Sequence, residues 1–213
     1  MATCKMILII IFTGIFLFLT ACLDLKQPRN KIEYYTLEYD PPSAGERPVL
    51  PWAIQVAQFS VSPIYNNSRI VYRDKAFKRQ TYAYYMWRAN PGDLVSYFLS
   101  RDMKQSGLFK AVLTQGSNLP ASYLVEGSVD DFYELDGKNA WKAVLSVSVA
   151  VMDESELDFS KKILFQKTYR STRPCHQKNP RALAQAMSQA MSEISEKIIN
   201  DCYDYMASKI KTN

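Results

Sequence analysis

Two stretches of the chain carry apolar residues at every third or fourth position, the spacing of one helix face. The first contains Val95, Phe98, Leu99 and Met103. It follows Asn90-Pro91-Gly92-Asp93, a typical helix start with Asn as the N-cap, Pro at the first helical position and Asp placed to bond back to the cap. Gly107 then stands where a left-handed residue commonly ends a helix. The pattern predicts a helix over residues 91–106.

The second stretch lies near the end of the chain and opens with Pro180. Polar residues such as Gln185 and Glu196 lie on the other side of its helical wheel. A helix is therefore expected from Pro180 to about Tyr205. Its apolar stripe consists of Leu183, Met187, Ala190, Ile194, Ile198 and Tyr205.

Alternation of apolar and polar residues predicts seven or so strands in the rest of the chain. Asp136-Gly137-Lys138-Asn139 is the expected turn between the two longest strands, and residues 173–179 are expected to form a loop. In the second long strand, Lys142, Ser146 and Ser148 share the face that should meet water or a partner. The expected strands are residues 34–37, 53–59, 69–73, 78–87, 109–113, 123–131, 141–151 and 163–169.

The fold class predicted from these elements is α+β or α/β. Two helices and about seven strands suit a mixed sheet packed by helices on one or both faces. Residues 34–208 are expected to form one domain, and residues 209–213 a short tail. Without residues 1–21, the 213-residue chain keeps 192 residues, enough for one sizeable core.

The amino terminus follows a different pattern. One basic residue, Lys5, precedes an uncharged apolar run from Met6 to Leu19, and Leu19-Thr20-Ala21-Cys22 closes that run with small residues and a cysteine. This resembles the lipobox of bacterial lipoproteins. The resemblance implies cleavage between Ala21 and Cys22, so that residues 1–21 are a signal peptide, and attachment of diacylglycerol and a further acyl chain such as palmitate to Cys22. Two or more chains hold a protein firmly to a membrane.

An uncleaved transmembrane anchor is the alternative reading of this segment, because the apolar run from Met6 to Leu23 reaches about 18 residues, at the low end of what a bilayer requires. Either reading places the remaining chain on the same side of the membrane. Leu23 follows the cysteine and Asp24 comes one residue later, so an inner-membrane retention aspartate is not in its usual place. An outer-membrane destination is favoured.

Residues 22–33 have mixed charge and no pattern, which is typical of a tether. The eleven residues that follow Cys22 span at most about 36 Å. We therefore expect the domain to stay close to the bilayer surface.

Composition narrows the function. Beyond residue 21 the net charge is near +4 with interspersed signs, which does not suggest nucleic-acid binding. The seven glycines form no phosphate-binding motif, so no nucleotide or other cofactor is expected. The excess lies in aromatic residues, 14 Tyr, 10 Phe and 3 Trp, and favours a binding or packing role.

Catalytic and metal sites are not expected. The single histidine, His176, stands beside Cys175, but adjacent side chains rarely converge and no third member is marked. One His and two distant Cys are too few ligands for zinc. The acidic pairs Asp130-Asp131 and Asp153-Glu154 fall at strand ends or turns, where solvated acids are usual. We expect no enzyme activity.

No disulfide is predicted between Cys175 and Cys202. If the last helix is unbroken, Cys202 lies about 33 Å along it, while the five residues from Pro180 back to Cys175 reach at most about 17 Å. A disulfide requires α-carbons within about 7 Å.

The better functional candidate is an aromatic and basic hairpin. Tyr82 and Tyr84 should point to one side of a strand and Tyr85 and Trp87 to the other, leaving one set at a surface. Packing in the core and on the sheet is the alternative role for these side chains. The candidate partner-binding residues are Tyr65, Arg69, Tyr72, Arg73, Tyr82, Tyr84, Tyr85 and Trp87.

The order of several motifs resembles the ABC-transport auxiliary lipoproteins, the PqiC-like family, from about residue 34 to 206. The resemblance implies a fold like the N-terminal domain of TolB, an anticodon-binding-like mixed sheet of about five strands with helices packed on it. It brings no catalytic residues. The motifs are Tyr34-Tyr-Thr-Leu37, Val61-Ser-Pro-Ile-Tyr65, Arg69-Ile-Val-Tyr-Arg-Asp74, Tyr84-Tyr-Met-Trp-Arg-Ala-Asn-Pro-Gly-Asp-Leu-Val95, Ser106-Gly-Leu-Phe109 and Tyr123-Leu-Val-Glu-Gly127.

This resemblance implies a periplasm-facing envelope lipoprotein that works with an ABC transporter and its MCE-domain (MlaD-like) protein to move lipid between membranes. Membrane attachment through the anchor and a transporter partner are therefore expected, and self-association into a homo-oligomer is left open. The alternative is an envelope assembly or scaffold lipoprotein that binds a barrel protein or a cell-wall component.

Overall fold

One long strand, β7 (Tyr123–Asp136), organises the sheet. Along one edge it pairs in parallel, one after another, with β2 (Leu50–Val56), β3 (Ser60–Val61) and β4 (Arg69–Arg73). Along its other edge it pairs in antiparallel fashion with β8 (Trp141–Asp153) over its whole length. Three short strands and one long one thus share a single central partner.

Four more strands complete the sheet. β6 (Phe109–Thr114) pairs in parallel with β2, and β9 (Ile163–Cys175) is antiparallel to β8. β5 (Gln80–Trp87) forms a hairpin with β4, and β1 (Glu33–Tyr35) is parallel to β5. This nine-stranded mixed sheet belongs to the part of the chain described in this computed structural model, residues 31–43, 45–137 and 140–210. It confirms the predicted α+β class, with more strands than expected.

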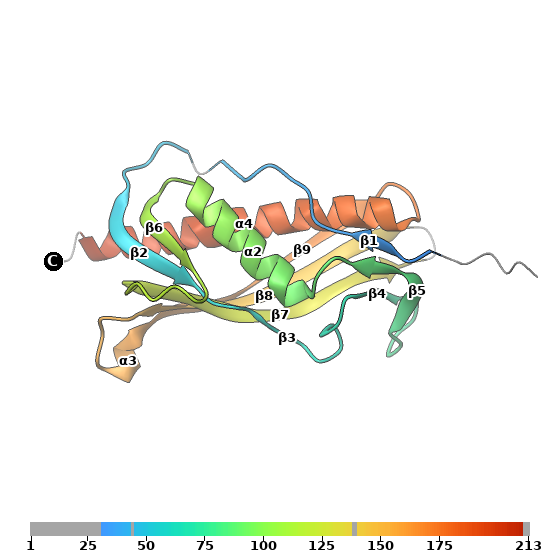
Figure 1. Ribbon diagram of the computed structural model, residues 1–213, viewed down its shortest axis with the longest axis horizontal. Helices are drawn as coiled ribbons and strands as arrows, with labels where there is room; N and C mark the ends of the chain where they lie inside the picture. Colours follow the sequence, from blue (N-terminus) through green and yellow to red (C-terminus); the bar gives the residue numbers. More distant parts are fainter. Residues whose placement is uncertain (1–30, 44, 138–139, 211–213) are drawn as a thin grey trace, which may run out of the picture. The chain divides into compact units, whose positions relative to one another are not determined.

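The two long helices, α2 (Pro91–Gln105) and α4 (Pro180–Ile210), lie on the same face of the sheet (Figure 1). Helix α2 packs over the β2, β6 and β7 side, whereas α4 packs over β8 and β9. A single helical turn, α3 (Phe159–Lys162), precedes β9. Across the described ranges, no helix is long and apolar enough to cross a bilayer.

The core lies between this sheet face and the two helices. Val125, Val129 and Leu145 from β7 and β8 are fully buried, as are Met187 and Ile194 from α4. Full burial of an aliphatic side chain of this size contributes about 1.5–3 kcal/mol each. The predicted apolar stripe from Leu183 to Ile198 is therefore the face of α4 that meets the sheet, whereas Tyr205, its last predicted member, is 49 % exposed.

Both helices begin where the sequence predicts. The Asn90 side chain accepts a hydrogen bond of 3.0 Å from the Gly92 N–H, which caps α2. Helix α4 continues without a break to Ile210, five residues beyond the expected end. Cys175 ends β9 and Cys202 lies in α4, and both are buried free cysteines.

Two strands extend further than expected because their patterns change. A bulge between Val129 and Asp131 shifts the alternation of β7, so Phe132 and Glu134 turn toward the core and the strand runs on to Asp136. β9 continues to Cys175, although residues 173–179 were expected to form a loop. Ser171 and Arg173 occupy inward-facing positions of β9, but they are polar and donate hydrogen bonds to Glu193 of α4. The alternation of apolar and polar residues that would indicate a strand is therefore missing from this part of the sequence.

Two expectations about strand faces are wrong. Ser146 is buried, because Asp131 and Arg170 lie opposite it on the two neighbouring strands and form an ion pair of 2.7 Å across it. Tyr82 and Tyr85 do not point to opposite sides of β5, since their rings meet edge to face at 5.6 Å. The register between β4 and β5 is irregular at this point, which disrupts the strict alternation of side chains.

The short elements were harder to predict. The second expected strand begins and ends three residues earlier than predicted, which leaves Phe59 beyond its end, and neither β3 nor α3 was expected. The expected signal peptide lies outside the described residues, as do the expected cleavage site between Ala21 and Cys22, the lipidation predicted for Cys22, and the end of the tail.

Candidate functional site

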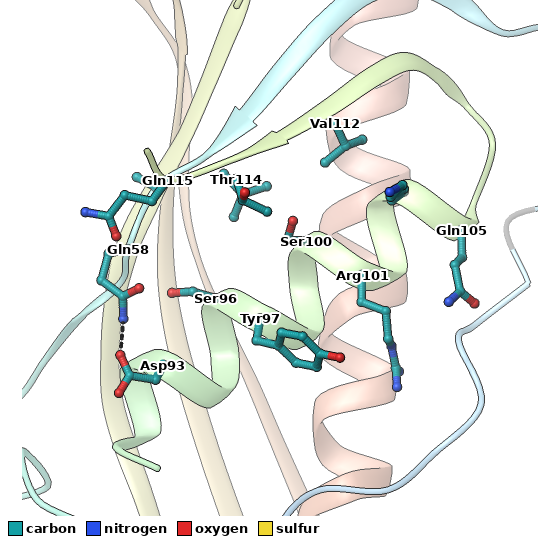
Figure 2. A pocket seen from close by; sticks show the side chains of 13 residues that line it. Gln58, Asp93, Ser96, Tyr97, Ser100, Arg101, Gln105, Val112, Thr114 and Gln115 are labelled. Carbon is teal, nitrogen blue, oxygen red and sulfur yellow. Dashed lines mark hydrogen bonds between the residues drawn. The ribbon is translucent and has the colours of Figure 1, made fainter. Parts of the chain in front are cut away.

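A groove of about 840 Å³ lies between helix α2 and the strands β2 and β6 (Figure 2). Val56 and Val112 provide an apolar floor, and Tyr97 and Arg101 stand on the helical wall. Gln58, Thr114 and Gln115 form a polar rim at one end. The groove is thus a surface hollow with an apolar base and polar margins.

The helical wall is fixed to the sheet at Ser96. Its hydroxyl donates a hydrogen bond of 2.8 Å to the Gly92 carbonyl and accepts one of 2.8 Å from the Phe59 N–H. At the start of the helix, the Gln58 side-chain amide donates to Asp93 at 2.6 Å and closes the near end of the groove (Figure 2). The groove therefore has a fixed width at this end.

Arg101 is held rigidly on the same wall. Its Nε and Nη2 donate hydrogen bonds of 2.9 and 2.7 Å to the buried carboxylate of Asp102. The guanidinium also lies over the rings of Tyr39 and Phe98, at 4.4 and 4.6 Å. Asp102 balances its charge, so the Arg101 side chain on this wall is held in one orientation and carries no free charge.

Two features next to the groove remain available for contact. Tyr97 is 66 % exposed although it stands beside an apolar floor. β6 ends the sheet on this side, and among the described strands only β2 pairs with it. Edge strands can accept an extended segment of another chain through backbone hydrogen bonds. The groove and this edge together form a docking surface, defined here as Tyr97, Arg101, Val112, Thr114 and Gln115.

Two of the predicted hairpin residues belong to the core. Trp87 is buried and packs edge to face on Phe132 at 5.1 Å. Tyr65 is buried too, stacks on Tyr133 at 6.0 Å and donates a hydrogen bond of 3.2 Å to Asp131. The prediction that Trp87 and Tyr65 contact a partner is therefore wrong, because a partner cannot reach a buried side chain.

Tyr72, Arg73, Tyr82 and Tyr85 are half-buried in the hairpin. The rings of Tyr72 and Tyr82 are 4.8 Å apart, and the Tyr82 hydroxyl donates to both oxygens of buried Glu134, at 3.1 and 3.2 Å. Burial raises the pKa of Glu134, and the Tyr82 hydrogen bond opposes that rise. These contacts give the half-buried tyrosines a packing role.

Arg69 and Tyr84 are the candidates that the structure leaves exposed. Sequence reasoning missed a more exposed residue at the hairpin tip, Phe77, and also missed Tyr97 and Arg101 in the groove. The groove had a weak signal, since Tyr97, Arg101 and Lys104 recur at helical spacing on the polar side of α2.

The residues considered as candidates for catalysis either form other contacts or lie in different environments. His176 is exposed, whereas Cys175 is buried, and that burial together with nearby Glu134 raises the pKa of the thiol to about 11. Asp130 accepts hydrogen bonds from Ser128 and Ser148.

The other acidic residues have cationic neighbours. Asp131 pairs with Arg170, Asp153 lies 3.9 Å from Lys209, and Glu154 lies 3.2 Å from Lys162. The described residues contain no group of three or more side chains suited to hold a metal ion.

The fold and the surface define an α+β domain that presents a groove, an open strand edge and exposed aromatic side chains to other molecules. The sequence model of the ABC-type transport auxiliary lipoprotein components matches residues 35–199. The chain belongs to this family of envelope lipoproteins.

Solved structures share the fold. Protein XCC0632 from Xanthomonas campestris aligns with a TM-score of 0.72 and 19% identity over 85% of this chain and 99% of that one. An uncharacterized protein aligns at 0.63 and 11% identity, over 81% and 99% of the two chains. CT253 from Chlamydia trachomatis aligns at 0.51 and 12% identity, over 75% and 99%. No curated protein matches the chain at a significant level.

Proposed function

We propose that this protein is a non-enzymatic auxiliary lipoprotein of an ABC transporter that moves lipid between the inner and outer membranes. Cys22 carries the lipid anchor, which holds the domain on the periplasmic side of the outer membrane. An MCE-domain protein of the transporter is the partner. Another subunit hydrolyses ATP in the cytoplasm, and this chain supplies a docking domain near the receiving membrane.

The observation that carries the docking role is the α2–β6 groove beside an open strand edge. An extended segment of the MCE-domain partner would pair with β6 and place an apolar side chain on Val56 and Val112. Main-chain hydrogen bonds then supply affinity, and the groove beside Tyr97 supplies specificity.

A peptide suits this groove better than a lipid tail does. The rim carries polar and charged groups, Gln58, Asp93 and Lys104, and the hollow is open to solvent. An acyl chain bound there would leave much of its apolar surface in water, at a cost of roughly 25 cal/mol for each Å² left exposed. We therefore assign lipid handling to the complex and not to the interior of this domain.

The anchor is tested by metabolic labelling. Radiolabelled palmitate should be incorporated into the wild-type chain, which should leave membranes only in detergent. The Cys22→Ser variant should take up no label and should be released without detergent. A wild-type chain that takes up no label and leaves the membrane in high salt would contradict the anchor.

The docking surface is tested by photocrosslinking in whole cells. A benzophenone amino acid replaces Tyr97 in the groove, with Tyr84 on the hairpin and Leu157 in an exposed turn as matched positions. The MCE-domain protein of the same cell should be crosslinked from position 97 and not from 157. Crosslinking from position 84 alone would move the partner to the hairpin. Capture of a barrel protein from position 97, with no MCE-domain protein, would favour the scaffold alternative.

A further inference from the structure

The tip of the β4–β5 hairpin, residues 74–79, presents a single large apolar side chain. Phe77 is fully exposed to solvent. Its backbone is in the left-handed region, with φ at 60°, and it is the one non-glycine residue with positive φ in the part of the chain that the structure describes. A bulky residue is disfavoured in this conformation. Phe77 thus contributes neither buried area nor a relaxed turn to the fold.

The surroundings of Phe77 are basic. Lys75 and Lys78 lie within two residues of it and are exposed, whereas Arg79 is half-buried and its guanidinium lies over the Tyr133 ring at 5.2 Å. Asp74 is the acidic residue in this stretch and lies 3.9 Å from Lys78. An exposed apolar side chain with exposed lysines close to it along the chain is complementary to a bilayer surface that carries anionic headgroups.

The strand pairing places this tip at the end of the domain where the tether joins it. β1 is parallel to β5, with Glu33 opposite Tyr85, so the chain enters β1 from the side on which β5 leaves the tip (Figure 1). Phe77 precedes Tyr85 by eight residues, at most about 26 Å along the strand. The tether after Cys22 spans up to about 36 Å, so both can meet one bilayer.

Further exposed side chains stand near the start of β1 and in the strand beside it. Ile32, Tyr34 and Tyr84 are each about half exposed, and Arg88 lies over the Tyr34 ring at 5.3 Å. Tyrosine is enriched where proteins meet the interface between lipid and water. The end that receives the tether is therefore more aromatic and apolar than a solvated surface requires.

We propose that the hairpin tip is a second membrane contact, with Phe77 inserted among the headgroups of the anionic bilayer that holds the lipid anchor. The inference rests on the lipid anchor proposed above. It orients the domain, because the tip end of the sheet then faces the membrane. Val56 and Arg73 lie opposite β7 residues ten positions apart, Val125 and Leu135, about 33 Å along the strand. The groove is thus held away from the bilayer, where a transporter partner can reach it.

The experiment measures the depth of two labelled positions in the full lipidated chain, reconstituted in vesicles of phosphatidylethanolamine and phosphatidylglycerol. Phe77→Cys carries an environment-sensitive fluorophore, and Leu157→Cys in the turn between β8 and β9 carries the same label as the matched control. Nitroxide-bearing phospholipids quench a label that reaches the interface. Cys175 and Cys202 are buried, so the introduced thiol is the accessible one within the described domain.

Loss of most of the emission at position 77, with position 157 unaffected, is the expected result. Exchange of phosphatidylglycerol for phosphatidylcholine should reduce that quenching, and Lys75→Glu with Lys78→Glu should reduce it too, read out at position 77. Equal quenching at both positions, or none at either while the chain still sediments with the vesicles, overturns the membrane contact and leaves the anchor standing. A chain that fails to sediment overturns the anchor itself.

Discussion

The hydroxyl of Tyr39 donates a hydrogen bond of 2.6 Å to the buried carboxylate of Asp102, and so ties the segment between β1 and β2 to helix α2. Tyr39→Phe removes the donor and leaves one Asp102 oxygen without this partner, which should lower the free energy of unfolding by about 1–3 kcal/mol. Urea unfolding measures the change. Tyr97→Phe, at an exposed position of the same helix, should stay within about 0.5 kcal/mol of the wild type. Equal stability of both variants would show that this tie contributes nothing.

Glu193 on α4 should make stability depend on acid. Burial alone would raise the pKa of this carboxyl, but hydrogen bonds from Lys197 and Ser171 and the charge of Arg173 outweigh it and lower the pKa to about 2. A lowered pKa stabilises the fold above the usual value of 4.5, and this contribution is lost as the pH falls toward 2.

Glu193→Gln should therefore cost about 1–2 kcal/mol at neutral pH, and the difference from the wild type should disappear near pH 2. Thermal unfolding as a function of pH gives both values. Glu196→Gln, an exposed neighbour on the same helix, is the control and should follow the wild-type curve. A constant difference between E193Q and wild type at all pH values would contradict the assignment.

Gly127 in β7 should tolerate no side chain. A β-carbon there would lie 2.1 Å from the Ser148 carbonyl oxygen and 2.6 Å from the Phe59 ring. Because the closest atom is backbone in the central pair of strands, Gly127→Ala should cost about 1–3 kcal/mol or more. In Gly116→Ala the new β-carbon meets open space, so only the positive φ of 88° destabilises the variant, by about 1 kcal/mol. Chemical denaturation compares the two, and a larger loss at Gly116 would mean that this clash is relieved by movement of the strands.

Phe77→Asn should stabilise the isolated protein. Asparagine tolerates the left-handed conformation better than phenylalanine does. Relief of the backbone strain at φ 60° should therefore raise the free energy of unfolding by up to about 1 kcal/mol. The same substitution at neighbouring Lys78, which has ordinary φ, should bring no gain. Calorimetry of the detergent-solubilised protein measures both variants. A loss of stability in F77N would mean that the Phe77 side chain supports the fold.

The two cysteines within the described domain should be unreactive until the protein unfolds. Burial and the nearby Glu134 raise the pKa of Cys175 to about 11, and burial also raises the pKa of Cys202, which is completely enclosed. The reactive species is the thiolate, which is scarce at neutral pH for both residues. Alkylation followed by mass spectrometry should find both thiols unmodified in the native protein and modified in urea. Rapid modification of Cys202 in native conditions would contradict its burial.

The helices could be predicted because their signals are local. Asn90, Pro91 and Asp93 define the start of α2 within four residues, and the stripe from Leu183 to Ile198 needs no knowledge of its partner. Parallel strand pairing is different, since β2, β3 and β4 meet β7 across long sequence separations. The extension of β9 depends on Glu193, a residue of another element, and no pattern within the strand announces it.

The candidate docking surface was less accessible to prediction for the same reason. Trp87 and Tyr65 are residue types that are common in interfaces, but in the fold they pack against Phe132 and Tyr133. The groove exists only because β6, which follows α2 in the chain, returns to pair with β2 and leaves space beside Tyr97. Exposure is a property of the assembled fold, whereas residue type is a property of the sequence.

The successive pairing of β7 with β2, β3 and β4 has a mechanical consequence. The strand that pairs with β2 beside the groove, with Val125 opposite Val56, also pairs with β4 of the hairpin, with Leu135 opposite Arg73, so one strand braces both ends of the domain. A pull on either end is resisted by the hydrogen bonds of β8 along the whole length of that strand. The domain can therefore act as a rigid spacer, with a separation between its two ends that is set by residue count.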